Sequence, residues 1–323
     1  MIRNKWYLVL ESREVKKNKI VGVKRLGEKL LFWRDKTGNL SCFIDVCAHR
    51  GAELHDGKIV NGHLQCPFHG LEYNSDGKVV YIPANGVDAL VNQNFRVTKY
   101  LTHEIDGFVF IYWGDQTENI PPPKFFEGLD KKYSRKTFTD PWGTHYSRCI
   151  ENQLDVSHLP FIHKTTIGAG DRKVVDGPVI KWIDENHFHL FVYNRKEDHN
   201  PPKKPDQLPQ DQVNKYRIEF IFPNIWQNFI FDKLRIVVGF VPIDQDNTLL
   251  YLRTYQKLFT LPPFSFLINT FFAFFNKIVL HQDRRIVLTQ EPRITALKMD
   301  ENLFQADLPI IKYRKRREEL KNN

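Results

Sequence analysis

Two pairs of cysteine and histidine lie close together near the start of the chain. Cys47 and His49 form a C-x-H pair, and Cys66 and His69 form a C-x-x-H pair. Thiolates and imidazoles are common metal ligands, and two short loops can bind one small metal centre between them. Two thiolates and two imidazoles could hold a pair of irons bridged by sulfide, with a raised reduction potential. A structural zinc ion would use the same side-chain types, so the spacing alone leaves both centres open.

A second group of candidate ligands follows after about a hundred residues. Asp155, His158 and His163 give the pattern D-x-x-H-x-x-x-x-H. On one helix Asp155 and His158 would share a face, and Pro160 would disturb that helix so that His163 could turn back towards the same metal. A third ligand must come from elsewhere, and we predict Asp283. Two histidines and one carboxylate form the facial triad of Fe(II) oxygenases.

Two neighbouring residues have open roles at this second site. Histidines on helices are often only packed or solvated, so the pattern by itself is weak. Asn152 could approach the metal or cap a helix turn, and the sequence does not decide between these. His281 lies two residues before Asp283 and could compete as a ligand. We expect a surface or supporting role for it instead.

The surrounding sequence predicts two regions of different structure. Short apolar runs separated by turn residues, as in KLLFWRD and LSCFIDV, indicate β-hairpins over the first 113 residues. Three prolines at 121–123 indicate a linker. A predicted helix over 148–163 follows, then strands between 179 and 259, an apolar helix and a separate helical stretch over 281–290. Strands bracketed by helices predict an α+β fold with a curved antiparallel sheet.

The residues around the first two pairs resemble the loops of Rieske iron–sulfur proteins. The resemblance lies in His49-Arg50-Gly51 and in Cys66-Pro67-Phe68-His69-Gly70. It implies a [2Fe-2S] cluster, with Cys47 and Cys66 on one iron and His49 and His69 on the other. Respiratory Rieske subunits carry an extra cysteine in each loop, and Gly51 and Phe68 stand there instead. Leu71 also departs from the tryptophan that is frequent after the second loop.

Together the two motifs resemble the oxygenase α-subunits of Rieske non-haem iron oxygenases, nearest to the α-only branch of demethylases and hydroxylases. The resemblance implies a Rieske domain at 1–120 and a catalytic domain of helix-grip type at 121–323, with mononuclear Fe(II) held by His158, His163 and Asp283. It also implies a head-to-tail homotrimer. In that assembly Asp155 would bridge a Rieske histidine and an iron-bound histidine of neighbouring subunits and take part in electron transfer.

Partners and substrate follow the same resemblance. Dioxygen and a small hydrophobic or heterocyclic substrate are expected, with electrons from a separate NAD(P)H-dependent reductase or ferredoxin, because the chain has no G-x-G-x-x-G fingerprint. A Rieske-type electron carrier and a non-catalytic binding protein are the alternatives, and neither needs three converging ligands. Aromatic residues of the second region could line an apolar pocket, although most are expected in the core: Trp226, Phe229, Phe231 and Phe240.

Composition restricts the remaining possibilities. The chain has 323 residues and a formal charge of +9, but its basic residues are spread out, which argues against nucleic-acid binding. Four cysteines are too few for a disulfide framework, and the N-terminal segment has no secretory pattern, so we expect a cytoplasmic protein. The stretch Phe264 to Leu280 is shorter than the roughly 20 residues that span a bilayer, and we expect a largely buried helix there.

Overall fold

The chain folds into two compact units. The computed structural model describes residues 1–115, 119–208 and 216–322. One unit comprises Arg3–Pro123, and the other comprises Lys124–Asn323 together with Met1–Ile2. The division falls directly after the run of three prolines, whose rings prevent regular helix or central-strand structure.

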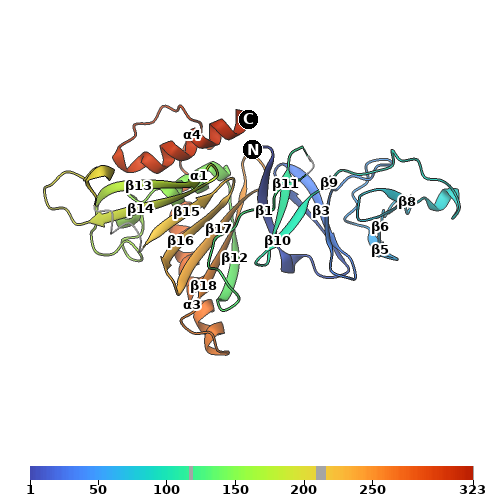
Figure 1. Cartoon of the computed structure of the whole chain (residues 1–323), viewed down its shortest axis with the longest axis horizontal. Coiled ribbons are helices and arrows are strands. Elements are labelled where there is room, and N and C mark those ends of the chain that lie inside the picture. The colour runs from blue at the N-terminus through green and yellow to red at the C-terminus, as the bar shows by residue number, and fades with distance from the viewer. Residues whose placement is uncertain (116–118, 209–215, 323) are drawn as a thin grey trace. The chain divides into compact units, whose positions relative to one another are not determined.

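The smaller unit consists of three antiparallel sheets (Figure 1). The first has the order β1 (Lys5–Glu11), β11 (Phe108–Trp113), β10 (Thr102–Ile105). The second has the order β2 (Lys19–Arg25), β3 (Glu28–Arg34), β4 (Leu40–Ile44), β9 (Lys99–Tyr100). The third has the order β5 (Lys58–Val60), β6 (His63–Gln65), β7 (Glu72–Tyr73), β8 (Val79–Tyr81). The third sheet supports both Cys–His loops, because one loop precedes β5 and the other joins β6 to β7.

The larger unit is built on one seven-stranded antiparallel sheet. Its strands, in spatial order, are β12 (Ser134–Trp142), β18 (Thr248–Gln256), β17 (Leu234–Pro242), β16 (Ile225–Phe231), β15 (Arg217–Ile221), β14 (His187–Arg195) and β13 (Val174–Asp184). The α-helices are α1 (Tyr146–Leu154), α2 (Leu159–Ile162), α3 (Phe264–Val287) and α4 (Leu308–Asn322). Helix α3 packs along β12 and β18, α1 against β17, and α4 against β13 (Figure 1). The predicted α+β class with antiparallel sheets is confirmed.

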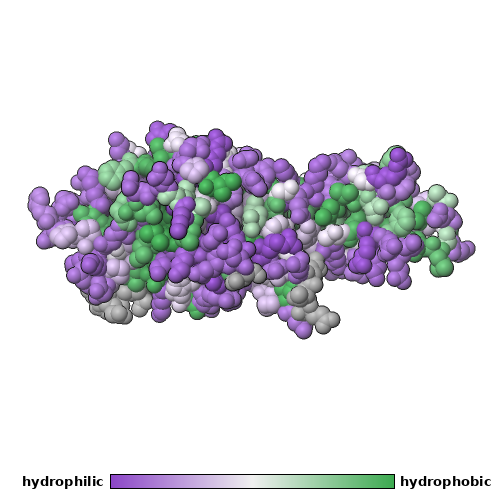
Figure 2. All heavy atoms as spheres, turned by 90° about the horizontal axis from the view of Figure 1, so that it is seen from above, coloured by the Kyte–Doolittle hydropathy of each residue, from purple (hydrophilic) through white to green (hydrophobic). Residues whose placement is uncertain are grey.

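The core of the larger unit lies between this sheet and its helices. Alternate strand residues face the helices, as expected for the two-residue period of a strand. Phe220 and Phe240 are fully buried and belong to the same cluster as Ile150 of α1 and Tyr313 of α4. Seen from the side on which α4 lies, hydrophilic side chains cover most of the surface, with some hydrophobic side chains gathered over the larger unit (Figure 2). Helix α4 lies on this side and packs against β13 (Figure 1).

The helix predicted over 148–163 is interrupted, which corrects the sequence analysis. Helix α1 ends at Leu154, and Asp155 adopts an extended conformation with φ −76° and ψ 135°. A new helical turn, α2, begins after His158. The cause is Pro160, which lacks an N–H and whose ring would clash with the carbonyl four residues earlier in a continuous helix. Asp155 and His158 therefore do not share a helix face.

The apolar stretch Phe264 to Leu280 also differs from what the sequence predicted. It continues without a break into the segment predicted as a separate helix, so Asp283 lies on the same helix as Phe264. Most of its large apolar side chains are exposed rather than buried. Among the described residues, α3 is the one helix long and apolar enough to cross a bilayer, and 22% of its most apolar window is buried. The expectation of a largely buried helix is therefore wrong.

Candidate metal centres

The two Cys–His loops share one backbone pattern. In each loop the cysteine N–H donates to the carbonyl five residues later, and the glycine four residues later donates back to the cysteine carbonyl. The four bonds are Cys47 N to Ala52 O at 2.8 Å, Gly51 N to Cys47 O at 2.9 Å, Cys66 N to Leu71 O at 2.8 Å and Gly70 N to Cys66 O at 3.1 Å. Gly51 and Gly70 have φ of 75° and 74°, a region that glycine adopts without strain. The pattern presents both Cys–His pairs in the same way.

The two loops bury their cysteine side chains and expose their histidine side chains. Cys47 and Cys66 are 4% and 2% exposed, whereas His49 and His69 are exposed. The two imidazole rings lie with centroids 4.6 Å apart in an edge-to-face arrangement. One side of the candidate centre is therefore enclosed by the hydrophobic core around the cysteines, and the histidine side faces solvent.

The Tyr73 hydroxyl contacts the first loop at Cys47 and Ala48. Its hydroxyl oxygen accepts a bond from the Ala48 N–H at 3.0 Å and lies 3.1 Å from Cys47 Sγ. Since this oxygen already accepts from Ala48, its own proton is free to be donated to the sulfur. Burial is the main cause that raises the pKa of Tyr73, so the hydroxyl keeps that proton. A phenol proton directed at a buried sulfur stabilises negative charge there.

The residues fit an iron–sulfur cluster. Burial raises the pKa of the Cys66 thiol, so an ionised sulfur at this position requires a bound cation nearby. None of the four cysteines, all of which lie in the described part of the chain, forms a disulfide. Leu71, at the position where tryptophan was expected, is 2% exposed and belongs to the same core cluster as Cys47 and Cys66. The local packing is therefore complete with leucine.

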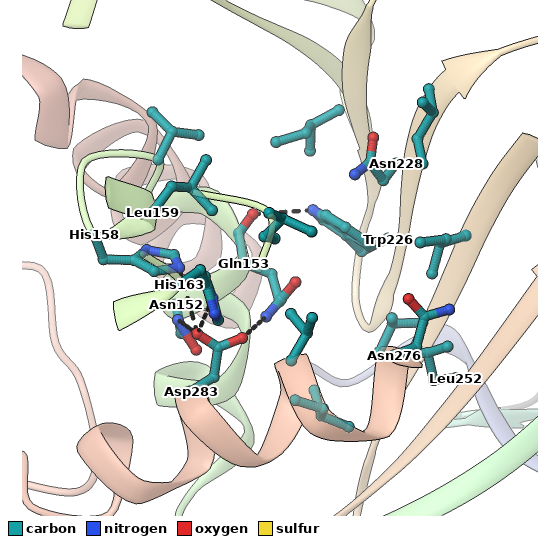
Figure 3. A pocket seen from close by; sticks show the side chains of 18 of the residues that line it. Asn152, Gln153, His158, Leu159, His163, Trp226, Asn228, Leu252, Asn276 and Asp283 are labelled. Atoms are coloured by element: carbon teal, nitrogen blue, oxygen red, sulfur yellow. Dashed lines mark hydrogen bonds and ion pairs between the residues drawn. The ribbon is translucent and has the colours of Figure 1, made fainter. Parts of the chain in front are cut away.

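The second site combines residues from two helical regions. His158 and His163 lie at the two ends of α2, and Asp283 projects from α3 towards both rings (Figure 3). Asp283 Oδ1 is 2.9 Å from His163 Nε2 and 3.4 Å from His158 Nε2. One ligand atom from each of the three residues lies within 4.8 Å of the others, a spacing that a single metal ion can bridge.

Two amides of α1 hold the Asp283 carboxylate. Asn152 Nδ2 donates to Asp283 Oδ1, and Gln153 Nε2 donates to Asp283 Oδ2, both at 3.3 Å. Trp226 Nε1 in turn donates to the backbone oxygen of Gln153 at 3.1 Å. Burial works against ionisation of Asp283, but the two histidines outweigh it and lower its pKa. The carboxylate is therefore anionic and held in one orientation.

Gln282 sets the tautomer of His163. Its Oε1 lies 2.8 Å from His163 Nδ1 and also accepts a bond from the Thr166 hydroxyl at 3.0 Å. A carbonyl oxygen only accepts, so Nδ1 carries the proton and Nε2 keeps its lone pair. The lone pair is directed to the same side as Asp283, as a metal-binding imidazole requires.

Asp155 has the corresponding position beside His158. Its Oδ1 accepts bonds from Ser157 N and Ser157 Oγ, both at 2.7 Å, and its Oδ2 lies 3.4 Å from His158 Nδ1. Burial lowers the pKa of His158, but Asp155 and Asp283 outweigh it and raise this pKa to about 9. The Asp155 carboxylate thus orients His158 on the ring nitrogen opposite to Asp283.

The site fits a divalent metal of the iron type. Asn152 Oδ1 is buried beside Asp283, and no residue in the described part of the chain forms a hydrogen bond with it, which is costly unless something else approaches it. Two imidazoles, which a bound metal ion would hold in the neutral form by displacing the proton from Nε2, and one carboxylate on one side of that ion match the facial triad and leave other positions open. The site residues predicted from sequence thus fall into two groups, the Cys–His loops and this triad with Asp155. His281 does not join them, because its Nε2 lies 3.4 Å from Asp140 Oδ2 and its side chain is 46% exposed.

A cavity of about 320 Å³ opens above the triad. Its walls are formed by the sheet, α1, α2 and α3 (Figure 3). The apolar wall includes Ile218, Trp226, Ile236, Leu252, Phe272, Phe275 and Val279. Polar groups on the wall away from the triad are Asn228 and Asn276 (Figure 3). The dimensions and lining suit a small, largely apolar molecule.

The structure separates the aromatic residues that were candidates for the pocket wall. Trp226 lines the cavity. Phe240 lies in the core, Phe229 stacks against the Arg235 guanidinium, and Phe231 is exposed. Sequence reasoning missed Phe272 and Phe275 because their helix was expected to pack by apolar burial alone. Alternation along β15 to β18 could have indicated Ile218 and Ile236, which share one row of the sheet.

A third histidine–carboxylate group lies in the larger unit. His187 and His189 on β14 approach Glu219 on β15, with Nε2 to Oε2 distances of 3.5 and 3.4 Å. Arg217 Nε donates to Glu219 Oε1 at 2.7 Å. The guanidinium already neutralises this carboxylate and would repel a cation, so we interpret the group as an ion-pair network.

Family models match most of the chain. A Rieske [2Fe-2S] domain matches residues 5–100, and the vanillate O-demethylase oxygenase C-terminal domain matches residues 142–323. The chain belongs to the Rieske oxygenase family. Membership assigns a [2Fe-2S] cluster and a mononuclear iron as the cofactors of this Rieske oxygenase.

Two curated relatives each match about half of this chain. Chlorophyllide a oxygenase of Chlamydomonas reinhardtii is 32% identical over 169 residues, which are 52% of this Rieske oxygenase and 26% of the relative. The oxygenase component of dicamba O-demethylase from Stenotrophomonas maltophilia is 31% identical over 166 residues, 50% of this chain and 48% of the relative. The chain thus spans about half, or less, of these relatives.

Solved structures match the fold along the whole Rieske oxygenase. Dicamba monooxygenase bound to dicamba aligns with a TM-score of 0.76 at 19% identity, covering 100% of this chain and 98% of that chain. NdmA of Pseudomonas putida CBB5 with caffeine aligns with a TM-score of 0.74 at 23% identity, covering 99% and 91%. Identities at this level establish a shared fold and leave the substrate open.

Proposed function

We propose that the chain is the oxygenase component of a multicomponent Rieske oxygenase. It would use O₂ and electrons from a separate NAD(P)H-dependent reductase or ferredoxin to hydroxylate or oxidatively demethylate a small hydrophobic or heterocyclic substrate. The observation that carries the proposal is the convergence of His158, His163 and Asp283 beneath an apolar cavity in a chain that also carries the Cys–His loops. An electron carrier needs neither the triad nor the cavity.

Each site residue has a proposed role. Cys47 and Cys66 bind one iron of the cluster, and His49 and His69 bind the other. His158, His163 and Asp283 bind the mononuclear iron. When bound, the cluster supplies single electrons and the mononuclear iron supplies activation of dioxygen. We assign the first role to a domain at 1–120 and the second to a domain at 121–323.

The other residues of the second site bind, orient and exclude water. Gln282 and Asp155 hold the two imidazoles from behind, which keeps their Nε2 atoms aimed at one point. The apolar wall keeps water away from that point. Asn228 Oδ1 is buried and has no hydrogen-bond partner among the described residues, and it would accept a bond from an N–H or O–H group of the substrate. Such a contact would fix which carbon lies above the triad.

The overall chemistry balances with an external donor. One dioxygen, a pair of electrons and a pair of protons enter each turnover. One oxygen atom enters a substrate C–H bond, and the other leaves as water. When the hydroxylated carbon was an O-methyl or N-methyl group, the product loses formaldehyde and the demethylated substrate remains.

We also propose a head-to-tail homotrimer in the cytoplasm, with Asp155 linking the cluster of one subunit to the iron of the next. The support is that Asp155 contacts His158 on one side while its own side chain keeps 25% exposure. The unpaired cysteines suit a reducing compartment. Sedimentation equilibrium of the reconstituted protein tests the trimer, and a monomer with full activity would contradict it.

The function is tested by reconstitution. The chain is loaded anaerobically with iron and sulfide, and its EPR spectrum is recorded after reduction. O₂ uptake and formaldehyde release are then measured with a surrogate reductase across a panel of aromatic methyl ethers, N-methyl heterocycles and lipophilic alcohols. Substrate-dependent O₂ uptake with a matching product supports the proposal. A stable cluster that only shuttles electrons, with an empty triad, would contradict it.

A further inference from the structure

Helix α3 is turned with its polar residues inward. Its buried residues include Ser265, Asn269 and Asn276, while Phe271 and Phe274 are 61% and 66% exposed. A surface helix of a globular protein normally presents its apolar stripe to the core and its polar residues to solvent. The reversed arrangement means that α3 exposes an apolar surface for which the described residues offer no cover.

Specific hydrogen bonds hold this orientation. Asn269 Nδ2 donates to Ser134 Oγ at 2.7 Å, and Gln256 Nε2 donates to Asn269 Oδ1 at 3.2 Å. Asn276 Nδ2 donates to Thr254 Oγ1 at 2.9 Å. Rotating α3 to bury its phenylalanines would leave these polar groups without partners, which is costly in the interior. The exposed face is therefore a fixed property of the fold.

The exposed apolar side chains lie along α3 and in the loop that precedes it, and those with the three- and four-residue spacing of one helix face are Phe264, Leu267, Phe271, Phe274 and Ile278. We call the whole set of exposed apolar side chains the α3 apolar face, and each member is between 39% and 75% exposed: Leu258, Phe259, Leu261, Phe264, Phe266, Leu267, Phe271, Phe274 and Ile278. The first turns of α3 extend past the end of β18 (Figure 1). Monomeric soluble proteins rarely leave a large apolar area uncovered.

The segment that forms the α3 apolar face carries basic side chains and no acidic ones, although Asp130 pairs with Lys257 at its start. No aspartate or glutamate occurs between residues 258 and 282. Lys277 is exposed on the helix itself, and Lys136 Nζ lies 5.0 Å from the Phe266 ring centroid. An apolar surface rich in phenylalanine and bordered by lysines matches the boundary between acyl chains and anionic headgroups.

We propose that the α3 apolar face docks on an anionic lipid surface, with α3 lying in the plane of the interface. The helix has the composition of a membrane span, but its inward side is bonded to β12 and β18. It therefore cannot leave the sheet to cross the bilayer. Docking places the phenylalanines among the acyl chains and the lysines beside the phosphates.

A second copy of the chain related by a two-fold axis is a less suitable occupant, and a head-to-tail neighbour would cover the α3 apolar face only with a different surface of its own. A two-fold interface would place the same α3 apolar face against itself, together with Lys277 and Lys136 of both copies. The segment supplies no carboxylate to offset these like charges. An anionic membrane supplies both an apolar phase and the opposite charge.

Docking would also place the cavity beside the lipid. The inner side of α3 lines the cavity with Phe272, Phe275 and Val279, while its outer side carries the docking face. A lipophilic substrate could then enter from the bilayer past α3. This consequence rests on the proposed oxygenase function, whereas the docking itself does not.

Vesicle flotation of the reconstituted full chain tests the docking. Vesicles of phosphatidylcholine with about 30% phosphatidylglycerol are compared with pure phosphatidylcholine at about 0.1 M salt. The wild-type chain should float with the anionic vesicles. Phe271→Ser with Phe274→Ser should lower the partition coefficient about tenfold or more on both lipids. Lys277→Glu should lower it several-fold on the anionic vesicles alone, at about 1 kcal/mol per basic residue.

Matched controls separate docking from general loss of surface hydrophobicity. Val87→Ser with Leu90→Ser removes side chains that are 82% and 98% exposed in the smaller unit. Lys315→Glu reverses an exposed lysine on α4. Both controls should float like the wild type. Circular dichroism and iron content confirm that each variant is folded.

Two results would overturn the proposal. One is flotation of the double phenylalanine variant equal to that of the wild type. The other is a wild-type chain that does not float but self-associates in sedimentation velocity, with association abolished by the same two substitutions. The second result would assign the α3 apolar face to another copy of the chain. Neither depends on whether the protein turns over a substrate.

Discussion

The two candidate metal centres differ in where they place their ligands. The cluster loops bury the two cysteines and expose the two histidines, over a stretch of 23 residues from Cys47 to His69. The triad buries His163 and Asp283 almost completely, and it draws on segments more than a hundred residues apart. One centre has a side open to solvent, and the other lies beneath an apolar cavity.

This difference suits the roles that we propose for the two centres. An electron carrier needs an exposed ligand edge through which a donor protein can pass single electrons. A centre that activates dioxygen needs to be kept from water, so that reducing equivalents are not lost in side reactions. The supporting residues differ accordingly. Tyr73 adjusts the charge on a sulfur, whereas Gln282 and Asp155 fix the directions of imidazoles.

Removing a triad ligand should have the largest effect and should leave the cluster intact. His163→Ala is expected to lower product formation about 1000-fold or more, because the mononuclear iron loses one of its protein ligands. Product is measured by chromatography, and the cluster by its visible absorbance. His187→Ala, at a half-buried histidine beside Glu219, should keep normal turnover. Loss of the cluster absorbance in His163→Ala would contradict the separation of the two centres, and equal loss of turnover in His187→Ala would contradict the special role of the triad.

Removing a cluster ligand should give the reverse pattern. Cys66→Ser is expected to abolish the cluster absorbance and to lower steady-state turnover about 100-fold or more, while iron still binds at the triad. Cys149→Ala, at a buried cysteine outside both centres, is the control and should keep the cluster. If Cys66→Ser also emptied the triad, the two centres would not be independent.

Removing Asp155 should disconnect the centres without emptying them. Asp155→Ala at saturating iron is expected to keep both metals and to lower coupled turnover by about 10- to 100-fold. The ratio of product formed to O₂ consumed is the measurement. Asp184→Ala, which removes a carboxylate paired with Lys124, serves as the control. Normal product formation by Asp155→Ala would remove Asp155 from the electron route.

Removing Gln282 should lower the iron affinity of the triad, with a smaller effect than removing one of its ligands. Gln282→Ala leaves His163 Nδ1 without its acceptor, so the ring can reorient, and iron affinity should fall about tenfold. Iron binding is measured by competition with a chelator. His281→Ala changes the adjacent residue, whose ring faces Asp140, and should leave the affinity unchanged. A larger effect at His281 would make it a ligand.

Removing the Tyr73 hydroxyl should have the smallest effect, confined to the cluster. Tyr73→Phe deletes the bond to Cys47 Sγ, which stabilises the more negative reduced cluster. Loss of about 0.5–1.5 kcal/mol corresponds to a potential lowered by roughly 20–60 mV for one electron. Spectroelectrochemistry measures the shift, and Tyr81→Phe is the control. A raised potential would contradict the assigned direction of the hydrogen bond.

Local motifs were the part of the molecule most readily predicted from sequence. The Cys–His loops are short, and the positive φ of Gly51 and Gly70 explains why glycine occurs at both positions. The hairpins of the smaller unit likewise follow from turn residues between apolar runs. A disturbance of the helix at Pro160 was predicted, but the break lies earlier than expected, because α1 already ends at Leu154 and Asp155 is extended. Proline's missing N–H and ring clash decide the local structure there.

Long-range geometry was harder to predict. Asp283 was chosen as a distant carboxylate, but its contacts with Asn152 and Gln153 depend on how α1 and α3 pack. The prediction that α3 is largely buried was wrong, because its composition suggested that its phenylalanines would pack in the core. The hydrogen bonds of Asn269 and Asn276 to the sheet overrode that tendency, and a sequence window does not contain those partners.

Metal and sulfide content tests the central claim of two separate iron centres most directly. The wild-type chain and His163→Ala are reconstituted anaerobically, desalted and analysed for iron, zinc and acid-labile sulfide, together with EPR of the reduced samples. The account predicts about three irons and about two sulfides per wild-type chain. It predicts the loss of about one iron in the variant, with sulfide and the cluster signal unchanged. Zinc in place of sulfide-bridged iron, or loss of the cluster signal in His163→Ala, would contradict it.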